Sequence, residues 1–388
     1  MSSLFPTYAR WDITPVSAKG AWLTDNNGKK FLDFTTGISV CNLGHVPDNV
    51  KQAVQDQIGK FWHTSNLFQI ELQEEVAKQL ATASGLDLVF FANSGAEANE
   101  AAIKLARKAT GRPKVITFVD SFHGRTFATM AATGQEKIKT GFGPMLEKFE
   151  YVPFNDLKAL KKAIDGETAA IMFEVIQGEG GLNAGEPEFL RQAEELAHNN
   201  GSLVIVDEVQ TGIGRTGKPF AFQHIALNPD IVSSAKGIAS GLPLGAIIGK
   251  KELAEAFSPG SHGSTFGGNP VSLAAAKETL KTIFESSFLE EVTRKGNKLS
   301  SLLAGALSSV PQVKKLKGKG LMIGIEMNEE AAPFIPAARA KGLLILTAGT
   351  NTIRLLPPLN VTDEEIEQAA AILVDTIKEL AYEKTAGN

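Results

Sequence analysis

Two apolar, largely β-branched runs near the middle of the chain constrain its fold more than any other feature. The first covers residues 203–206 and stops at Asp207, and the second begins at Ile231 and leads toward Lys236. Continuous apolar runs of this length are typical of strands buried on both faces of a parallel sheet. Ligands of open α/β sheets bind beyond the carboxyl ends of the strands. We therefore expect Asp207 and Lys236 to face one crevice.

A lysine and an aspartate in one crevice suggest a particular chemistry. A partly desolvated lysine is a good nucleophile for forming a Schiff base. Pyridoxal phosphate is held in this way, with an acidic residue on its pyridine nitrogen. Taken alone, the two residues also fit a second interpretation, in which Asp207 caps a turn and Lys236 is an exposed side chain with a buried stem.

Apolar runs alternate with amphipathic stretches on both sides of this region. Buried strands are predicted at 88–91, 115–118 and 169–173, and helices from the Ser94 region to about Ala109 and over 188–199. Repeated strand–helix order is typical of a largely parallel sheet in an α/β fold.

The two ends of the chain lack the regular alternation of strands and helices, so the sequence predicts three parts. Residues 1–45 are expected to form an N-terminal arm with a hairpin at 25–28, and residues 46–271 a large domain. Residues 272–388 are expected to form a smaller α+β domain, on which the arm packs. Within it we predict strands at 320–325, 343–346 and 352–356.

Helices frame this smaller domain in the prediction. A helical stretch runs from Ser272 to about Leu307. The last helix starts at a capping box, residues 362–365, and is expected to end near Leu380.

Composition and charge narrow the class of protein. The chain has 388 residues, 43% hydrophobic and 21% charged, so a packed globular protein is expected. The net charge of -4 includes no basic patch for nucleic acid. Cys41 is the only cysteine, which excludes an internal disulfide and fits a reducing compartment. No signal peptide or membrane span is visible, so a cytoplasmic location is expected. The six histidines lack metal-ligand spacing, so no metal site is expected.

Three short segments offer contacts for an anion or an aromatic ring. Ser94 with Glu97 fits a capping box, and the small residues Gly95 and Ala96 let a phosphate approach the first amides of a helix. A plain capped helix would explain the same residues.

Two further segments carry side chains of suitable chemistry. Phe122 could stack on a ring and Arg125 could hold a carboxylate with two hydrogen bonds. Alone, they also fit a core aromatic and a surface cation. Ser264 and Thr265 lie in a Gly-rich turn and could meet a phosphate.

A competing motif predicts nucleotide binding. Residues 212–217 match G-x-G-x-x-G and, with Lys218, the start of a P-loop. The dinucleotide motif should follow its strand directly and open a helix, but residues 207–211 intervene. A P-loop needs Ser or Thr after the lysine, where this chain has Pro219. Context therefore argues against both versions.

Taken together, the segments closely resemble the class-III pyridoxal-phosphate aminotransferases of fold type I. The resemblance covers nearly the whole chain, from Ala21-Trp22 to the helix after Thr362. It is carried by Ser94-Gly95-Ala96-Glu97-Ala98-Asn99, Phe122-His123-Gly124-Arg125, Asp207-Glu208-Val209-Gln210, Ala235-Lys236-Gly237 and Ser264-Thr265-Phe266-Gly267-Gly268-Asn269-Pro270.

The resemblance implies roles at the cofactor. Lys236 would form the Schiff base and later carry a proton, and Asp207 would pair with the ring nitrogen. Gln210 would meet the phenolic oxygen of the ring, with Glu208 and Val209 of the same motif beside the cofactor.

The remaining cofactor contacts are also implied by the resemblance. Phe122 would stack on the ring, and Gly95 and Ala96 would donate amides to the phosphate. Thr265 would reach the phosphate of a neighbouring subunit, so the implied assembly is a homodimer with shared active sites.

Substrate contacts follow from the same resemblance. Arg125 and Ser264 would bind the substrate, and Glu179 would pair with Arg354 as a switch that admits two substrates in turn. Ile38 stands where ornithine-specific relatives carry a tyrosine that reads a free α-amine.

The implied reaction moves the δ-amine of N2-acetyl-L-ornithine to 2-oxoglutarate, giving N-acetyl-L-glutamate 5-semialdehyde and L-glutamate, in L-arginine biosynthesis. Alternative substrates are ornithine, succinylornithine, succinyl-diaminopimelate and 4-aminobutyrate. The alternative of a different class is a nucleotide-binding α/β protein.

Overall fold

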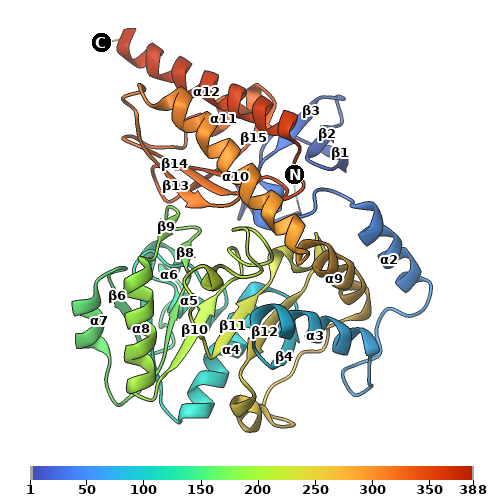
Figure 1. The fold of residues 1–388 in the computed structure, drawn as a ribbon, viewed down its shortest axis with the longest axis vertical. Coiled ribbons are helices and arrows are strands. Elements are labelled where there is room, and N and C mark those ends of the chain that lie inside the picture. Colours follow the sequence, from blue (N-terminus) through green and yellow to red (C-terminus); the bar gives the residue numbers. More distant parts are fainter. Residues whose placement is uncertain (1–2, 387–388) are drawn as a thin grey trace.

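The computed structural model describes residues 3–386, and its centre is a large sheet (Figure 1). Within these residues the sheet has seven strands in the order β4-β12-β11-β10-β7-β5-β6. Their bounds are β4 Leu88–Ala92, β5 Lys114–Phe118, β6 Phe149–Val152, β7 Thr168–Phe173, β10 Leu203–Asp207, β11 Ile231–Ser234 and β12 Gly245–Gly249.

The sheet is parallel except at one strand. Strands β6, β5, β7, β10 and β11 pair in parallel, whereas β12 runs antiparallel to β11 and β4. The fold predicted from the sequence is therefore confirmed. One detail was wrong: β4 was expected to be buried, but it lies at the sheet edge and its first residue, Leu88, is 45% exposed.

Alternate side chains of each strand pack against helices on opposite faces of the sheet. Ile205 packs with the alanine-rich helix α4, Gly95–Thr110, and Val206 packs with the helices of the other face. The helices of that face include α3 Glu71–Ser84, α7 Leu157–Ala163 and α8 Pro187–Asn199. Burial on both faces explains why these strands are uniformly apolar.

Shorter helical elements connect the strands. They are α1 Thr36–Ser39, α2 Asp48–Ile58, α5 Phe127–Ala132, α6 Glu136–Lys139, and the 3₁₀ turns η1 Ala221–His224, η2 Lys236–Ala239 and η3 Lys251–Phe257. The short hairpin of β8 Ile176–Gln177 and β9 Asn183–Ala184 follows β7.

Two smaller sheets lie beside the large one in the described part of the chain (Figure 1). One has the order β13-β14-β17-β16, with β13 Val313–Lys319, β14 Met322–Met327, β16 Leu346–Ala348 and β17 Thr352–Leu355. The other has the order β1-β2-β3-β15, with β1 Pro15–Lys19, β2 Trp22–Asp25, β3 Lys30–Asp33 and β15 Leu343–Leu344. The hairpin expected at 25–28 joins β2 to β3 and is confirmed.

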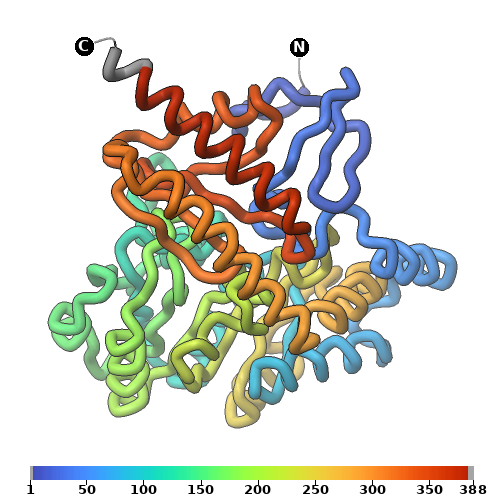
Figure 2. The backbone as a smooth tube through the Cα atoms, turned by 45° about the horizontal axis from the view of Figure 1, so that its top comes forward, coloured from blue at the N-terminus to red at the C-terminus, as the bar shows by residue number. Residues whose placement is uncertain are grey.

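The sheet β1-β2-β3-β15 combines the two ends of the chain. Strand β3 pairs in parallel with β15, and Trp22 Nε1 donates to Glu365 Oε1 at 2.8 Å. Figure 2 shows the blue N-terminal segment beside the orange and red C-terminal segments. Residues of the N-terminal segment thus contact the C-terminal part of the chain. The division of the chain after residues 45 and 271 stays a prediction.

Three predictions for the C-terminal part need correction. The single strand expected at 343–346 is two strands, β15 and β16, which pair in different sheets. The helical stretch from Ser272 is two helices, α9 Pro270–Ile283 and α10 Ser286–Leu307. After α11 Phe334–Ala340, the last helix α12 runs over Asp363–Ala386, past the expected end, because no Gly or Pro interrupts it before Ala386.

The capping box of α12 is confirmed. Thr362 Oγ1 accepts from the Glu365 amide at 3.2 Å, and Glu365 Oε2 accepts from the Thr362 amide at 2.9 Å. Among the helices that the structure describes, none combines the length and apolar composition needed to cross a membrane.

Candidate active site

The carboxyl ends of β10 and β11 meet at a pocket of about 220 Å³. Asp207 is the last residue of β10, and Lys236 follows β11 after one intervening residue. Both line the pocket, so the prediction that they face one crevice is confirmed. The lining is Gly95, Ala96, Asn99, Phe122, His123, Gly124, Arg125, Glu174, Glu179, Asp207, Val209, Gln210 and Lys236.

The Asp207 carboxylate is buried and fixed by three groups. Asn99 Nδ2 donates to Oδ2 at 2.7 Å, and His123 Nδ1 lies 2.8 Å from the same oxygen. The Val209 amide donates to Oδ1 at 3.0 Å. Hydrogen bonds of this kind hold a carboxylate in one orientation and stabilise its negative charge.

Lys236 is the first residue of the 3₁₀ turn η2, and its backbone has a conformation that residues other than glycine rarely adopt. Its φ is 47°, in the left-handed region, and such strain is common where a structure fixes a functional group. Burial lowers the pKa of its amine, although the charges of Glu179 and Asp207 oppose this effect. A lowered pKa favours the neutral amine, which is the nucleophilic form.

A cradle for an anion lies at the start of α4. Ser94 Oγ accepts from the Glu97 amide at 3.1 Å. The expected capping box is only half formed, because Glu97 Oε2 accepts from the Asn93 amide at 2.8 Å and not from Ser94. A Cβ on Gly95 would lie 2.7 Å from Val209 Cγ1, so the backbone needs glycine here.

The first amides of a helix have no intrahelical acceptor, so those of Gly95 and Ala96 favour an anion such as phosphate. Both residues line the pocket together with Lys236 and Asp207. An anion cradle, a lysine amine and a buried carboxylate in one pocket fit the chemical groups of pyridoxal phosphate.

An ion pair closes another side of the pocket. Glu179 Oε1 lies 2.6 Å from Arg354 Nη1, and Gln210 Nε2 donates to the same carboxylate oxygen at 3.1 Å. Burial raises the pKa of Glu179, but the charge and hydrogen bonds of Arg354 outweigh burial and leave that pKa below its usual range. Arg354 is 2% exposed and also donates to the Gly178 carbonyl at 2.8 Å.

The competing Gly-rich segment 212–217 is packed against other parts of the chain. Arg215 is fully buried and donates to Ser39 Oγ at 3.0 Å and to the Leu321 carbonyl at 3.1 Å. A Cβ on Gly214 would lie 2.4 Å from Ile283. The segment also opens no α-helix, so it does not form a nucleotide-binding loop.

Comparisons with known proteins agree with this geometry. A family model, aminotransferase class-III, matches residues 7–377. The chain belongs to the class-III aminotransferases. The acetylornithine aminotransferase of Bacillus subtilis is 56% identical, and the alignment covers 97% of this chain and 98% of that relative. The acetylornithine aminotransferase of Halalkalibacterium halodurans is 58% identical over 97% of this chain and 98% of its own length.

Solved structures of aminotransferases share the fold. The ornithine aminotransferase of Toxoplasma gondii, with partial occupancy of PLP at its active site, is 31% identical with a TM-score of 0.94 and covers 99% of this chain and 94% of its own. The N-acetylornithine aminotransferase of Stenotrophomonas maltophilia is 34% identical with a TM-score of 0.85, over 96% of this chain and 97% of its own.

In this class-III aminotransferase, most of the predicted site residues share the pocket. Phe122 is half-buried in its wall, and the Arg125 guanidinium lies 5.8 Å from the centre of the Phe122 ring. The Glu208 carboxyl points away from the pocket and accepts from Thr211 Oγ1 at 2.6 Å and from the Phe222 amide at 2.8 Å, so a place for Glu208 beside the cofactor stays a prediction. Burial raises the pKa of Glu208 to about 7.

Three predicted residues lie outside this pocket in the single chain. Ser264 and Thr265 line a second pocket of about 410 Å³ beside Phe266. Ile38 is 41% exposed on the short segment α1. These three residues are therefore not among those that line the pocket of Lys236 in the single chain.

Sequence reasoning missed four residues of the aminotransferase pocket: Asn99, His123, Gly124 and Glu174. The first three stand inside motifs already identified, so their spacing could have suggested them. Glu174 is buried and accepts from the Phe122 amide and the Gly178 amide, each at 3.1 Å. Burial raises its pKa to about 7. In the described residues, no group of His, Cys, Asp and Glu is arranged to hold a metal ion.

Proposed function

We propose that this aminotransferase uses pyridoxal phosphate to move the δ-amine of N2-acetyl-L-ornithine to 2-oxoglutarate, in L-arginine biosynthesis. The observation that carries the reaction type is the pocket that the half-buried Lys236 lines together with the fixed Asp207 carboxylate. The substrate is supported by the acetylornithine aminotransferases that are 50–58% identical to this chain.

The chain supplies the contacts and proton transfers. Asp207 and Gln210 would hold the ring polar atoms, Phe122 one ring face, and the amides of Gly95 and Ala96 the phosphate. When bound, the cofactor supplies an electron sink for breaking a C–H bond beside the transferred nitrogen.

The proton from that bond needs a nearby acceptor. Lys236 is placed in the pocket for this task, and its lowered pKa makes the neutral amine available as a general base. Its protonated form can then return the proton, so one side chain can serve both directions of transfer.

The Glu179–Arg354 pair supports the use of two different substrates at one site. While the pair is closed, the Arg354 charge is neutralised by Glu179 at 2.6 Å. When Glu179 turns away, Arg354 becomes free for the second carboxylate of glutamate or 2-oxoglutarate. Arg125 remains exposed in the pocket lining for a carboxylate common to both substrates.

The substrate proposal predicts a preference for acetylornithine over ornithine. We expect kcat/KM to be at least about tenfold higher for acetylornithine, because apolar Ile38 offers no hydrogen bond to a free α-amine. Ile38→Tyr should reduce this ratio, whereas Ile38→Val should preserve it. Steady-state kinetics on both amines decide the point, and equal kcat/KM values for the wild type would contradict the proposal.

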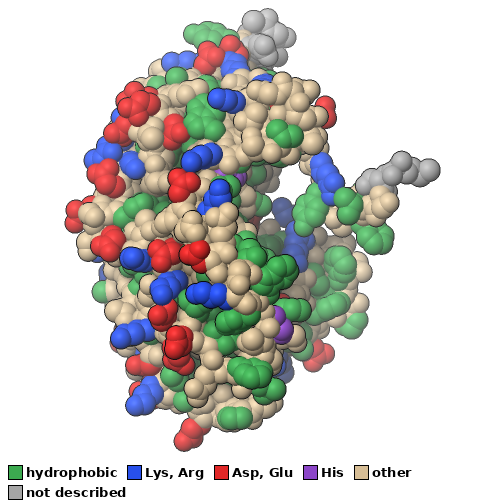
Figure 3. All heavy atoms as spheres, turned by 90° about the vertical axis from the view of Figure 1, so that its right-hand side faces the viewer, with side chains coloured by type: hydrophobic (Ala, Val, Ile, Leu, Met, Phe, Trp, Pro, Cys, Tyr) green, Lys and Arg blue, Asp and Glu red, His purple; other side chains and the backbone are tan. Residues whose placement is uncertain are grey.

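A homodimer is part of the proposal, because one chain leaves large apolar side chains exposed near its second pocket. Trp62, Leu67 and Phe68 are 65%, 93% and 65% exposed. Their segment adjoins Phe266, 61% exposed, through the hydrogen bond from Asn66 Nδ2 to the Gly267 carbonyl at 3.1 Å. Figure 3 shows hydrophobic side chains gathered on this side of the molecule. Apolar patches of this kind mark protein interfaces.

Light scattering should therefore give the mass of two 41.3 kDa chains. Leu67→Asp should shift the mass toward one chain and lower activity, because the shared site would come apart. Leu302→Asp, at a leucine 37% exposed on α10, is the matched control and should remain dimeric. A wild type with the mass of one chain would refute the assembly.

We place the reaction in the cytoplasm, where glutamate and 2-oxoglutarate are metabolites.

A further inference from the structure

We propose that Lys317 is a positioning residue, which holds the turn that carries Glu179 and thereby sets the balance between the two half-reactions. This inference rests on the proposed function, since it assigns a support to the Glu179–Arg354 switch. The turn in question, residues 178–182, joins β8 to β9.

The front of the turn faces the active site. Glu179 lines the pocket of Lys236, and its carboxylate is held by Arg354 and Gln210. The Gly349 amide donates to the Glu179 carbonyl at 2.8 Å. These contacts fix the carboxylate while the ion pair with Arg354 is closed.

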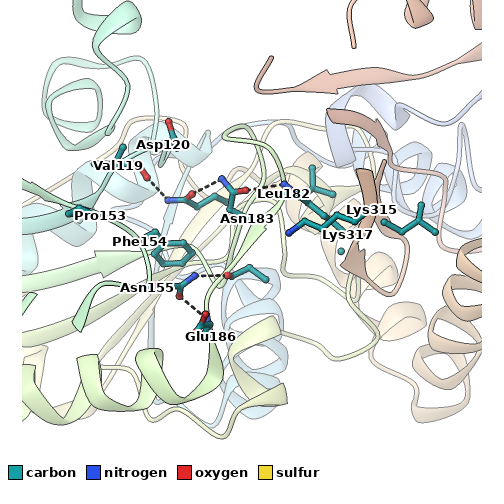
Figure 4. Close-up of a pocket in the computed structure, with 14 residues that line it drawn as sticks. Val119, Asp120, Pro153, Phe154, Asn155, Leu182, Asn183, Glu186, Lys315 and Lys317 are labelled. Atoms are coloured by element: carbon teal, nitrogen blue, oxygen red, sulfur yellow. Dashed lines mark hydrogen bonds between the residues drawn. The ribbon is translucent and has the colours of Figure 1, made fainter. Parts of the chain in front are cut away.

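The back of the turn faces a separate pocket of about 690 Å³, which also contacts β13 (Figure 4). A chain of hydrogen bonds crosses it. Gln177 Nε2 donates to the Val119 carbonyl at 2.8 Å, and Asn183 Nδ2 donates to the Gly180 carbonyl at 3.0 Å. Lys317 Nζ, from β13, donates to the Gly181 carbonyl at 3.1 Å and to Asn183 Oδ1 at 3.3 Å.

The register of the small sheet explains why Lys317 and Arg354 act on the same turn. Gly324 of β14 is paired with Lys317 of β13 on one side and with Arg354 of β17 on the other. Residues paired directly across antiparallel strands project from the same face of the sheet. Gly324 itself leaves room for the turn, because a Cβ there would lie 3.1 Å from Leu182 Cδ2.

Two cations on one rung therefore hold opposite ends of the turn. Arg354 donates to the Gly178 carbonyl and pairs with Glu179, and Lys317 donates to the Gly181 carbonyl. The Lys317 amine is itself fixed by Glu326, at 2.6 Å, and its side chain is 14% exposed. If Arg354 leaves Glu179 in one half-reaction, the Lys317 contact keeps the turn in place.

Removal of this contact should change the two half-reactions unequally. A loosened turn holds Glu179 less firmly against Arg354, and the acetylornithine half-reaction is the one that requires the closed pair. For Lys317→Met we expect kcat/KM for acetylornithine to fall between about threefold and tenfold relative to kcat/KM for glutamate. Each half-reaction is measured separately in single-turnover experiments.

Lys315→Met is the matched control. Lys315 lies on the same strand and lines the same pocket, but its side chain is 60% exposed and its amine is 3.9 Å from Glu326. The control should keep the wild-type ratio of the two half-reactions. Lys317→Arg should restore most of the ratio, because arginine keeps the donor and the charge.

A second readout does not depend on catalysis. In the cofactor-free protein, hydrogen–deuterium exchange at the amides of residues 178–182 should be faster in Lys317→Met than in Lys315→Met. Glu179→Gln provides the reference for the switch itself, because it removes the charge that Arg354 holds.

The outcomes separate the two ideas. A shifted ratio and faster exchange in Lys317→Met alone support the positioning role. An unchanged ratio, or equal losses in both half-reactions, overturns it if Glu179→Gln still shifts the ratio. If Glu179→Gln also leaves the ratio unchanged, the switch in the proposed function fails and the positioning role fails with it.

Discussion

Lys236→Ala is expected to lower kcat for transamination by at least about 10⁴-fold, because the variant loses both the nucleophilic amine and the general base. The protein should also lose the visible absorbance that a Schiff base with the cofactor gives. The fold should survive, since Lys236 is half-buried in the pocket lining and alanine also fits there. Transamination kinetics and an absorbance spectrum of the purified protein measure the two effects.

Lys218→Ala is the matched control for this change. Lys218 is exposed and belongs to the Gly-rich segment of the rejected nucleotide motif. Its removal should leave kcat and the spectrum unchanged. Retention of turnover and absorbance in Lys236→Ala would refute the catalytic assignment of the pocket.

Asp207→Asn is expected to lower kcat/KM by about 10²-fold to 10⁴-fold. The variant keeps the side-chain volume but removes the negative charge that would hold a proton on the ring nitrogen. Without that proton the ring is a weaker electron sink. The Asp207 oxygen that lies beside Asn99 Nδ2 and His123 Nδ1 would be replaced by an NH₂ group if the new amide turns its nitrogen that way, and an NH₂ group cannot accept a hydrogen bond. A buried donor left without an acceptor is expected to destabilise the fold by about 1–3 kcal/mol.

Asp230→Asn separates the two effects in that prediction. Asp230 is also buried, 6% exposed, but it lies at the start of β11, where it accepts from the Val204 amide at 2.8 Å and pairs with Lys250 at 2.7 Å. The pocket lies at the carboxyl end of β11, so Asp230 stands at the other end of that strand, away from the pocket. Asp230→Asn should lower the melting temperature with little effect on kcat/KM. Equal kinetic losses in both variants would show that Asp207 acts only through stability.

Much of the large sheet and of the cofactor site was predictable from the sequence. The runs at 203–206 and 231–232 are apolar on both faces, and this local pattern is sufficient to identify buried strands. The carboxyl ends of parallel strands lie on the same side of a sheet, so Asp207 and Lys236 were expected to lie near each other.

Other features depend on contacts between distant parts of the chain. Nothing near Leu343 indicates that the chain leaves one sheet and enters another at Ile345, because strand pairing is decided by partners at β3 and β17. The burial of Glu208 against Phe222, away from the pocket, is likewise invisible in the motif that contains it.

The sequence by itself determined the class of fold and placed the proposed lysine, acid and anion cradle after strands and at a helix start, because strands and helix starts follow from short local patterns, whereas their roles were implied by the resemblance of the combined motifs. Only the tertiary structure decided that His123 and Asn99 fix Asp207, that Glu174 joins the segments of Phe122 and Gly178, and that Lys317 shares a rung with Arg354. Those pairings depend on strand register and on packing between segments that lie far apart in the chain. Contacts of this kind leave no local pattern in a single sequence, so they could not be predicted from it.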